Sequence, residues 1–381
     1  MSEQAEKIEI RRGLKEVYFD RSRVCFIDGR AGELRYRGYS IHDLAAHSTF
    51  EETCHLLLKG ELPSRAQRAA FDAELKAARA LPAPVYDVIR AVQGAHPMDA
   101  LRTAVSALSA FDPETADKSA EATLRKGIRL TSQVPMIVAA HEAIRSGREP
   151  VAPDPKLPHA ANVLWMLKGT KPSADAAKLM DTDLILHAEH GSNASSFAAR
   201  VVTGTDANLH AAITAAIAAL SGPAHGGAAE NVMKMALEVG DASRVPEYVK
   251  RKRAAKEPVM GFGHRVYRAE DPRARHMRAG VERLSKEIGE PKWFQILEAL
   301  VEAMKPYARH GVNVNVDFYA GVVYYLNGIR EDLFVPIFAI GRVPGWTVQV
   351  LEQLENNILI RPLTLYTGPE PRPYPPLDAR G

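Results

Sequence analysis

The stretch "IHDLAAHSTFEETCHLLLKGELP", from Ile41 to Pro63, decides the fold class of this chain. Apolar residues recur in it at helical spacing, and Gly60 and Pro63 supply two signals that end a helix. The stretch therefore predicts two short helices. Because the same periodicity dominates the chain from Ile41 onward, we expect a mainly α protein.

The segment before this stretch has a different pattern. In "VCFIDGRAGELRYRGYS" (24–40), apolar and polar residues alternate around the turn-forming pair Asp28-Gly29. This alternation around a turn is typical of two antiparallel strands. We expect a small N-terminal β-hairpin ahead of the helices.

Two later stretches predict helices of particular kinds. "HAAITAAIAAL" (210–220) is nearly all apolar, which predicts a helix buried on every side. "PGWTVQVLEQLENN" begins with Pro344, and proline is favoured in the first turn of a helix. We therefore expect a new helix to begin at Pro344.

Breaks rich in proline and glycine divide the helical part. They are "GREPVAPDPKLPHA" (147–160) and "SGPAHGG" (221–227), and the tail carries five prolines between 369 and 376, which predicts an extended segment on a surface. A chain of 381 residues is too long for one ordinary core. We expect about two domains, with an insert of about a hundred residues starting near Gly222.

Composition excludes several classes of protein. Hydrophobic residues make up 46% and charged residues 25%, and the net charge of +3 gives no basic field for nucleic acid. The two cysteines form no disulfide framework, the start has no signal-peptide core, and no apolar run approaches the roughly 20 residues that span a bilayer. We expect a cytoplasmic enzyme or scaffold.

Two histidines three residues apart stand in "LILHAEHGSNASSFAARV". His187 and His190 would share one helix face, where such a pair can chelate a metal. The metal interpretation is the minor one, because no carboxylate-plus-histidine partner at helical spacing completes a ligand set. The alternatives are a buried hydrogen-bonded pair, or one ring that binds an anion while the other orients it.

A third histidine, His225, lies between a proline and a Gly-Gly pair in "SGPAHGG", just before a helical pattern. The positive end of a helix favours the neutral imidazole, which can donate a hydrogen bond to a developing oxyanion. The alternative is an ordinary turn histidine.

The stretch "MGFGHRVYRAEDPR" (260–273) sets His264 among glycines and follows it with Arg265, Arg268 and Arg273. "GFGH" matches no phosphate-binding fingerprint. The basic run "KRKRAAK" (250–256) lies just upstream, and next to this histidine it indicates a funnel for a phosphate-bearing substrate.

An aspartate and two arginines complete the set. Asp317, in "HGVNVNVDFYAGVVYYLNG", is either a helix N-cap or a partly desolvated base. Arg342 and Arg361 interrupt apolar surroundings, where a guanidinium needs a carboxylate partner. Without a metal signature or a nucleophilic serine or cysteine, this inventory suits a small polycarboxylate and an acid–base reaction at carbon.

The ordered set "HAEHGSNASSFAARV", "GPAHGG", "MGFGHRVYRAEDPR", "NVNVDFYAG" and "FAIGRVPGW…ILIRP" resembles the citrate synthase family, in its short bacterial and archaeal form that includes 2-methylcitrate synthases. The resemblance covers nearly the whole chain. It implies a two-domain helical fold in a homodimer, with the active site between the domains. The implied division is a large domain of 1–222 and 324–381, the latter with the C-terminal tail, and a small domain of 223–323.

The resemblance also implies roles for individual residues. Asp317 matches the base that deprotonates the acyl-CoA, His225 the donor to the enolate oxygen, and His264 the donor to the oxaloacetate carbonyl. The residues that match contacts of the oxaloacetate or product are His187, His190, Arg273, Phe338, Arg342 and Arg361, the last of these reaching the partner's active site. The residues that match the CoA site are Pro258, Val259, Met260, Gly261, Phe262 and Gly263, with Arg265 and Arg268 as phosphate partners.

The implied reaction joins acetyl-CoA to oxaloacetate with water, giving citrate and CoA, and needs no metal or redox cofactor. One departure from many relatives is the pair Gly191-Ser192, where bulkier residues are common. At 381 residues, we expect no room for the extra N-terminal domain of the NADH-inhibited form. One methylene is worth only about 1–3 kcal/mol of discrimination, so 2-methylcitrate synthesis from propionyl-CoA stays open. A metal-dependent hydrolase using His187 and His190, or a silent helical scaffold, are the remote alternatives.

Overall fold

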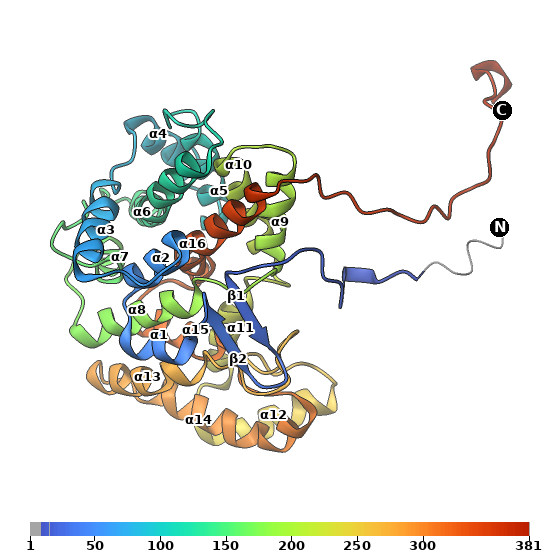
Figure 1. Ribbon diagram of the computed structural model, residues 1–381. Coiled ribbons are helices and arrows are strands. Elements are labelled where there is room, and N and C mark those ends of the chain that lie inside the picture. Colours follow the sequence, from blue (N-terminus) through green and yellow to red (C-terminus); the bar gives the residue numbers. More distant parts are fainter. Residues whose placement is uncertain (1–8, 15, 381) are drawn as a thin grey trace.

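The computed structural model describes residues 9–14 and 16–380, which form a mostly helical protein (Figure 1). The α-helices are α1 (Ile41–His47), α2 (Phe50–Lys59), α3 (Arg65–Ala77), α4 (Ala83–Ala91), α5 (Pro97–Leu108), α6 (Ala120–Arg145), α7 (His159–Lys168), α8 (Ala174–His187), α9 (Ala194–Gly204), α10 (Leu209–Leu220), α11 (Ala228–Val239), α12 (Val245–Ala254), α13 (Arg275–Glu287), α14 (Lys292–Met304), α15 (Asp317–Leu326) and α16 (Phe334–Glu355). Short 3-10 helices are η2 (Arg12–Leu14), η3 (Ala242–Arg244), η4 (Lys305–His310), η5 (Glu331–Leu333) and η6 (Leu377–Ala379). The expected mainly α class is confirmed.

The N-terminal hairpin is present and is one strand larger than expected. Strands β1 (Cys25–Asp28), β2 (Glu33–Tyr36) and β3 (Tyr39–Ser40) form an antiparallel sheet in that order, with Phe26 opposite Arg35. The third strand has only two residues, which is too short for an alternating pattern to reveal. The sheet leads directly into α1.

Local capping explains where the first helices begin and end. The Thr49 side chain accepts from the Glu52 N–H, and the Glu52 side chain accepts in return from the Thr49 N–H, which together start α2. The same helix stops at Gly60, whose φ of 96° lies in the left-handed region that glycine adopts without strain. The expected pair of short helices in 41–63 is thus confirmed.

Helix α16 forms the centre of the core, where it contacts α6, α8, α9 and α10 (Figure 1). Pro344 lies in its interior, so the expectation that a helix begins at Pro344 is wrong. The helix starts ten residues earlier because the apolar run from Phe334 packs on every side, and this packing outweighs the hydrogen bond that proline removes. The segment Glu331–Glu355 is long and apolar enough to cross a membrane, contrary to our expectation, but 94% of its most apolar window is buried inside the protein, as in a core helix.

Helix α10 is buried less completely than its composition predicts. It packs against α5, α9 and α16, yet Ala211 and Ala218 are exposed. An all-apolar composition therefore does not bury this helix on every side within one chain, because no element among residues 9–14 and 16–380 covers the face that carries these small alanines.

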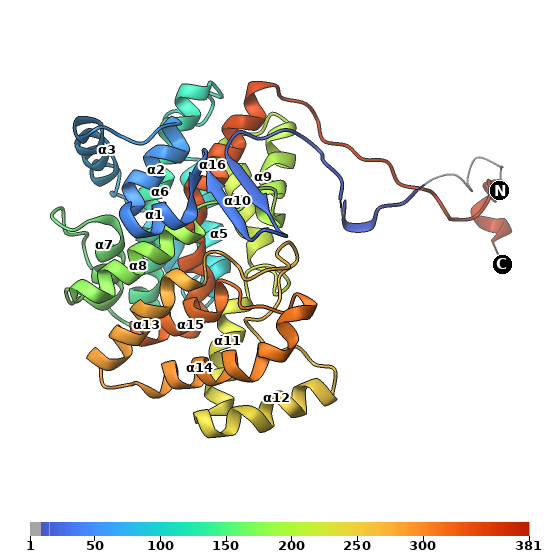
Figure 2. The same cartoon turned by 60° about the horizontal axis from the view of Figure 1, so that its bottom comes forward.

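The C-terminal tail leaves the helical body near the described N-terminal residues. Residues 357–376 form no helix or strand, and in both views they extend beyond the body next to the N-terminal segment (Figures 1 and 2). In the lower half of Figure 2, α11 to α15 gather into one group through the contacts of α11 with α15 and of α12 with α14. The polar residues that the sequence singles out lie between this group and α8, α9 and α16.

Candidate active site

His264 is held by two backbone groups. Its Nδ1 accepts from the N–H of Val266 at 3.0 Å and from the N–H of Tyr267 at 3.2 Å. Because a backbone N–H only donates, Nδ1 carries no proton, and the neutral ring must carry it on Nε2. Burial, followed by the charge of Arg273, lowers the pKa of His264 to about 4. The ring is therefore a neutral donor through Nε2 near pH 7.

His225 has the opposite tautomer. Its Nε2 accepts from the Ser195 N–H at 3.3 Å and lies 2.8 Å from the Ser195 hydroxyl, to which the indole N–H of Trp346 also donates at 3.0 Å. The proton of the neutral ring must then be on Nδ1. Burial, and then Arg342, lowers the pKa of His225 to about 4. The sequence alone does not predict Ser195 and Trp346 as site residues, because a serine in the first turn of α9 and a tryptophan in a core helix are ordinary features.

His187 and His190 do not share a helix face, which corrects the expectation from their spacing. His187 is the last residue of α8, and the chain has left the helix at His190, turning at Gly191 with a φ of 56°. Both rings are nevertheless buried in the cluster. His190 Nε2 lies 3.0 Å from the Tyr267 hydroxyl, and burial lowers the pKa of His190 well below its usual value.

Asp317 is the first residue of α15, one position inside the helix, so it is not the N-cap. Burial raises the pKa of its carboxyl, while the charges of His187 and Arg273 oppose that rise. Within residues 9–14 and 16–380, no side chain or N–H donates a hydrogen bond to this carboxylate. A half-buried carboxylate without a partner at a helix N-terminus is suited to act as a base.

Two arginines in the cluster differ in the partners of their guanidinium groups. Arg273 makes a paired contact with Asp271, at 2.9 Å from Nε and 2.7 Å from Nη2. Arg342 donates from Nε to the backbone carbonyl of His187 and stacks 4.7 Å from the Phe338 ring, but its buried Nη1 has no partner in the described part of the chain. Burial lowers the pKa of Arg342. A buried guanidinium without a paired carboxylate leaves room for an anionic ligand.

Phe338 lies between the histidines. Its ring centroid is 4.7 Å from that of His187 and 6.5 Å from that of His225. This aromatic face provides an apolar wall between the two rings. The structure thus brings together His187, His190, His225, His264, Arg273, Asp317, Phe338 and Arg342.

The predicted CoA loop (258–263) lies beside the segment that leads into Asp317. Gly263 donates to the Asn313 carbonyl at 2.7 Å, and Asn315 donates to the Gly261 carbonyl at 2.9 Å. Gly261 has a φ of 79°, and a Cβ there would lie 2.6 Å from the Phe318 ring, so only glycine fits.

The predicted phosphate partners Arg265 and Arg268 have exposed side chains just after this loop. The backbone N–H of Arg268 donates to the Gly29 carbonyl at 2.7 Å and ties this stretch to the β1–β2 turn. Both guanidinium groups therefore face solvent beside the cluster.

Arg361 lies outside the cluster. It is an exposed residue of the tail, beyond the end of α16. In Figures 1 and 2 the tail that follows α16 runs away from the helical body that contains α15.

No group of three or more His, Cys, Asp or Glu side chains suited to a metal occurs among the described residues. The Nε2 atom of His190 lies 3.0 Å from the Tyr267 hydroxyl, whereas His187 meets the Asp183 carbonyl through Nδ1 at 2.9 Å.

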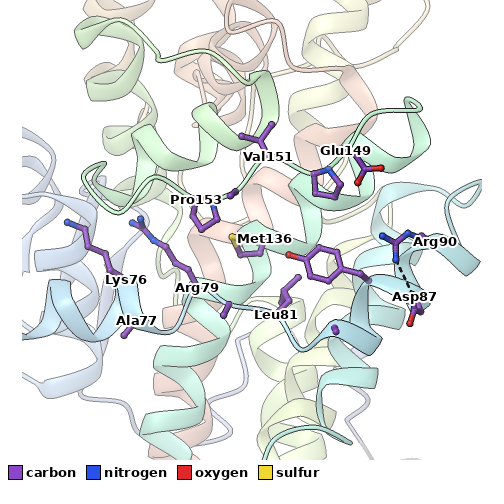
Figure 3. Close-up of a pocket in the computed structure, with 15 residues that line it drawn as sticks. Lys76, Ala77, Arg79, Leu81, Asp87, Arg90, Met136, Glu149, Val151 and Pro153 are labelled. Atoms are coloured by element: carbon purple, nitrogen blue, oxygen red, sulfur yellow. Dashed lines mark hydrogen bonds and ion pairs between the residues drawn. The ribbon is translucent and has the colours of Figure 1, made fainter.

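A cavity of about 680 Å³ lies elsewhere in the protein, between the end of α3, α4 and the loop after α6 (Figure 3). Met136 and Leu81 line its apolar part, and the Arg79 guanidinium at its edge donates to the backbone carbonyls of Asp154 and Leu157. None of the residues predicted for the active site lines this cavity.

Comparison with known proteins gives one consistent answer. The family model described as "Citrate synthase, C-terminal domain" matches residues 13–363. The citrate synthase of Haloferax volcanii is 45% identical over 98% of this chain and 99% of its own, and 2-methylcitrate synthase 1 of Corynebacterium glutamicum is 40% identical over 98% and 99%.

Solved structures agree with the sequence relatives. The citrate synthase of Pyrobaculum aerophilum superposes with a TM-score of 0.93 at 39% identity, covering 97% of this chain and 95% of that one. The ternary complex of carboxymethyl coenzyme A and oxaloacetate with the citrate synthase of Thermoplasma acidophilum gives 0.91 at 31% identity, covering 98% and 100%.

The helical fold and these relatives define a condensing enzyme of the acyltransferase type. The chain belongs to the citrate synthase family.

Proposed function

We propose that this chain is a citrate synthase that condenses acetyl-CoA with oxaloacetate and water to give citrate and CoA. One observation carries the proposal: two neutral histidines, His225 and His264, offer N–H donors through opposite ring nitrogens in the cluster that holds the unpartnered carboxylate of Asp317. An enolate reaction needs such a base and two such donors.

Asp317 is the base in this proposal. It removes a proton from the methyl group of the acyl-CoA, and the electron pair of the broken C–H bond moves into the thioester as an enolate or enol. His225 donates from Nδ1 to the thioester oxygen, which gains negative charge as the proton leaves. A positioned base contributes about 10²–10⁴ in rate and an oxyanion donor about 10²–10³.

His264 activates the other reactant. Its Nε2–H donates to the keto oxygen of oxaloacetate, so that the enolate carbon can attack the carbonyl carbon. The groups that hold the carboxylates are His190, Arg273 and Arg342, together with Arg361 of the partner subunit. The unpartnered Nη1 of Arg342 supports its part in this set, and Phe338 walls the same pocket.

CoA lies along residues 258–263, with Arg265 and Arg268 near its phosphates. The closeness of this loop to the segment before Asp317 supports the placement, because it brings the thioester toward the base. Hydrolysis of the citryl thioester then releases CoA, and closure of the site keeps water out until the new carbon–carbon bond exists.

The proposed domain division is a large domain of 1–222 and 324–381 and a small domain of 223–323. The gathering of α11 to α15 on one side of the cluster supports it. We also propose a homodimer in the cytoplasm without a resident cofactor, in which acetyl-CoA and oxaloacetate are substrates. The exposed position of Arg361 in the tail supports a contribution to the partner's site.

The second candidate is 2-methylcitrate synthesis from propionyl-CoA, which the names of relatives from Corynebacterium glutamicum and Mycobacterium tuberculosis favour. The deciding experiment measures release of free thiol from acetyl-CoA and from propionyl-CoA, with and without oxaloacetate. A larger kcat/KM for acetyl-CoA supports the first proposal, and a larger value for propionyl-CoA replaces it with the second. Absence of oxaloacetate-dependent release with both thioesters would refute the two together.

A further inference from the structure

Three aromatic rings meet where the loop of residues 260–273 faces the turn after α8. The Tyr267 ring centroid lies 4.7 Å from that of His264 and 5.5 Å from that of His190, and the two histidine centroids are 5.4 Å apart. The Tyr267 side chain is fully buried. The roles assigned above use both histidines but give none to this tyrosine.

The backbone around Tyr267 is fixed at three successive residues. The N–H groups of Val266 and Tyr267 both donate to Nδ1 of His264, and the N–H of Arg268 donates to the Gly29 carbonyl. The Tyr267 ring also packs against both histidine rings, which restricts its rotation. Tyr267 therefore presents its hydroxyl from a rigid support.

The Tyr267 hydroxyl meets His190 at one ring nitrogen, Nε2, at a distance of 3.0 Å. A hydroxyl can donate or accept, but a bare imidazole nitrogen is a much stronger base than a neutral phenol oxygen, so the hydroxyl is the donor. Burial lowers the pKa of His190 well below its usual value, so the ring is neutral near pH 7. A neutral ring with a bare Nε2 carries its proton on Nδ1, which is then the nitrogen that can donate to a ligand.

Two positive charges lie near His190. Arg273 and Arg342 both belong to the same cluster, and the buried Nη1 of Arg342 has no partner among the described residues. Two guanidinium groups and a ring that donates from Nδ1 offer only donors, which is the arrangement that a carboxylate needs. A bare Nδ1 would instead present a lone pair to the same anion and repel it. The tautomer of His190 therefore decides whether this corner of the site attracts a carboxylate.

We propose that Tyr267 is a positioning residue that donates to Nε2 of His190 and thereby fixes Nδ1–H of that ring as a donor to a carboxylate of oxaloacetate. The inference rests on the proposed function, in which His190 holds this substrate, and it adds the group that fixes the tautomer of the ring. Because His190 lies in the proposed large domain and Tyr267 in the proposed small domain, the same hydrogen bond joins the two domains at the site.

The first test removes only the hydroxyl. Tyr267→Phe keeps the ring that packs against His264, so kcat should stay within about threefold of the wild type. Calorimetric titration should show oxaloacetate binding weakened by about 10–100-fold, the range known for groups that orient metal-binding histidines. KM for oxaloacetate should rise with it, because the contact is made equally in the ground state and the transition state. The matched control is Tyr86→Phe, which removes a half-buried hydroxyl from the remote cavity and should match the wild type.

A double-mutant cycle with His190→Ala separates this role from packing. If the hydroxyl acts through His190, its removal costs nothing further once that ring is gone, so the double variant should bind oxaloacetate as His190→Ala does, within about twofold. Additive losses would mean that Tyr267 acts on another group, and they would overturn the proposal. Unchanged oxaloacetate affinity in Tyr267→Phe would overturn it too, as would an equal loss in Tyr86→Phe.

A third measurement does not depend on turnover. Nitrogen-15 NMR of the wild-type chain labelled at histidine, with His190→Gln used for assignment, reports which ring nitrogen of His190 holds the proton. We expect a protonated Nδ1 and a bare Nε2. The reverse pattern overturns the inference, and this measurement also decides the matter if Tyr267→Phe fails to fold. A wild type that releases no CoA from either thioester would instead refute the proposed function and leave the NMR result standing.

Discussion

His225 and Ser195 meet at two points: the histidine Nε2 lies 2.8 Å from the serine hydroxyl and 3.3 Å from the serine N–H. Together these contacts leave Nδ1 as the donating nitrogen of the neutral ring. A histidine that loses them is free to adopt the other tautomer or to rotate. The pairing therefore yields a direct prediction about Ser195.

Ser195→Ala should lower kcat by about 10–100-fold, because its hydroxyl orients the ring that, in the proposed reaction, donates to the thioester oxygen as this oxygen gains negative charge. KM for oxaloacetate should change little, since the variant leaves in place the arginines that are proposed to bind oxaloacetate. The control is Ser196→Ala on the same turn of α9: both serine hydroxyls meet the Asn193 amide, but only that of Ser195 also meets His225. Equal losses in the two variants, measured by thiol release, would mean that α9 is merely disturbed.

His264→Ala should act chiefly on kcat, because polarisation of the carbonyl matters most as the alkoxide forms. Loss of such a donor costs about 10²–10³ in kcat. The measurement is a steady-state titration of both substrates. An unchanged kcat with a raised KM for the acyl-CoA would show that His264 only binds.

The shared site predicts complementation between two inactive variants, Arg361→Ala and Asp317→Asn. If Arg361 serves the neighbouring chain, hybrid dimers contain one intact site and one site with both lesions. Random pairing makes about half of the dimers hybrid, so the refolded mixture should recover roughly a quarter of wild-type activity. Mass spectrometry of the mixture counts the hybrids. Hybrids without recovered activity would show that each Arg361 serves its own chain.

The free energy of unfolding should fall in mild acid, because some histidines are buried in the neutral form. Burial, with Arg79 nearby, lowers the pKa of His159 to about 3, so the unfolded chain takes up this proton first as the pH falls below about 6.5. Between about 6.5 and 3 the unfolded state binds more protons, and this residue alone removes up to about 1.4 kcal/mol of unfolding free energy per pH unit.

Urea titrations between pH 7.5 and 5 test whether the unfolding free energy falls as the pH falls. His159→Gln should flatten the dependence of the unfolding free energy on pH, whereas His47→Gln, at an exposed position, should leave it unchanged. A steeper loss of stability in His159→Gln would contradict the assignment.

Much of the architecture follows from periodicity and caps. The helical class, the hairpin and the stop at Gly60 could be predicted because each depends on neighbours in the sequence. The prediction that a helix begins at Pro344 was wrong because the preference of proline for a first turn was outweighed by tertiary packing around α16. The same limit explains α10, whose composition does not say which of its faces a single chain covers.

The site shows a similar division. His264, His225 and Asp317 stood out because glycines, prolines or polar residues in apolar surroundings mark them in the sequence. Ser195 carries no such mark, since serine in a first helical turn is common. Its importance depends on which of its atoms faces which ring nitrogen of His225, and that relation exists only after the helices have packed.

The bond between the Arg268 N–H and the Gly29 carbonyl has a practical consequence for anyone who redesigns this protein. A Cβ at Gly29 would stand 2.3 Å from the Val266 carbonyl, on the same stretch whose N–H groups hold His264. The small sheet therefore supports the loop that carries His264, more than two hundred residues away in sequence. Trimming or tagging the N-terminus should stop short of Val24, and position 29 should be left out of any mutagenesis library intended to preserve turnover.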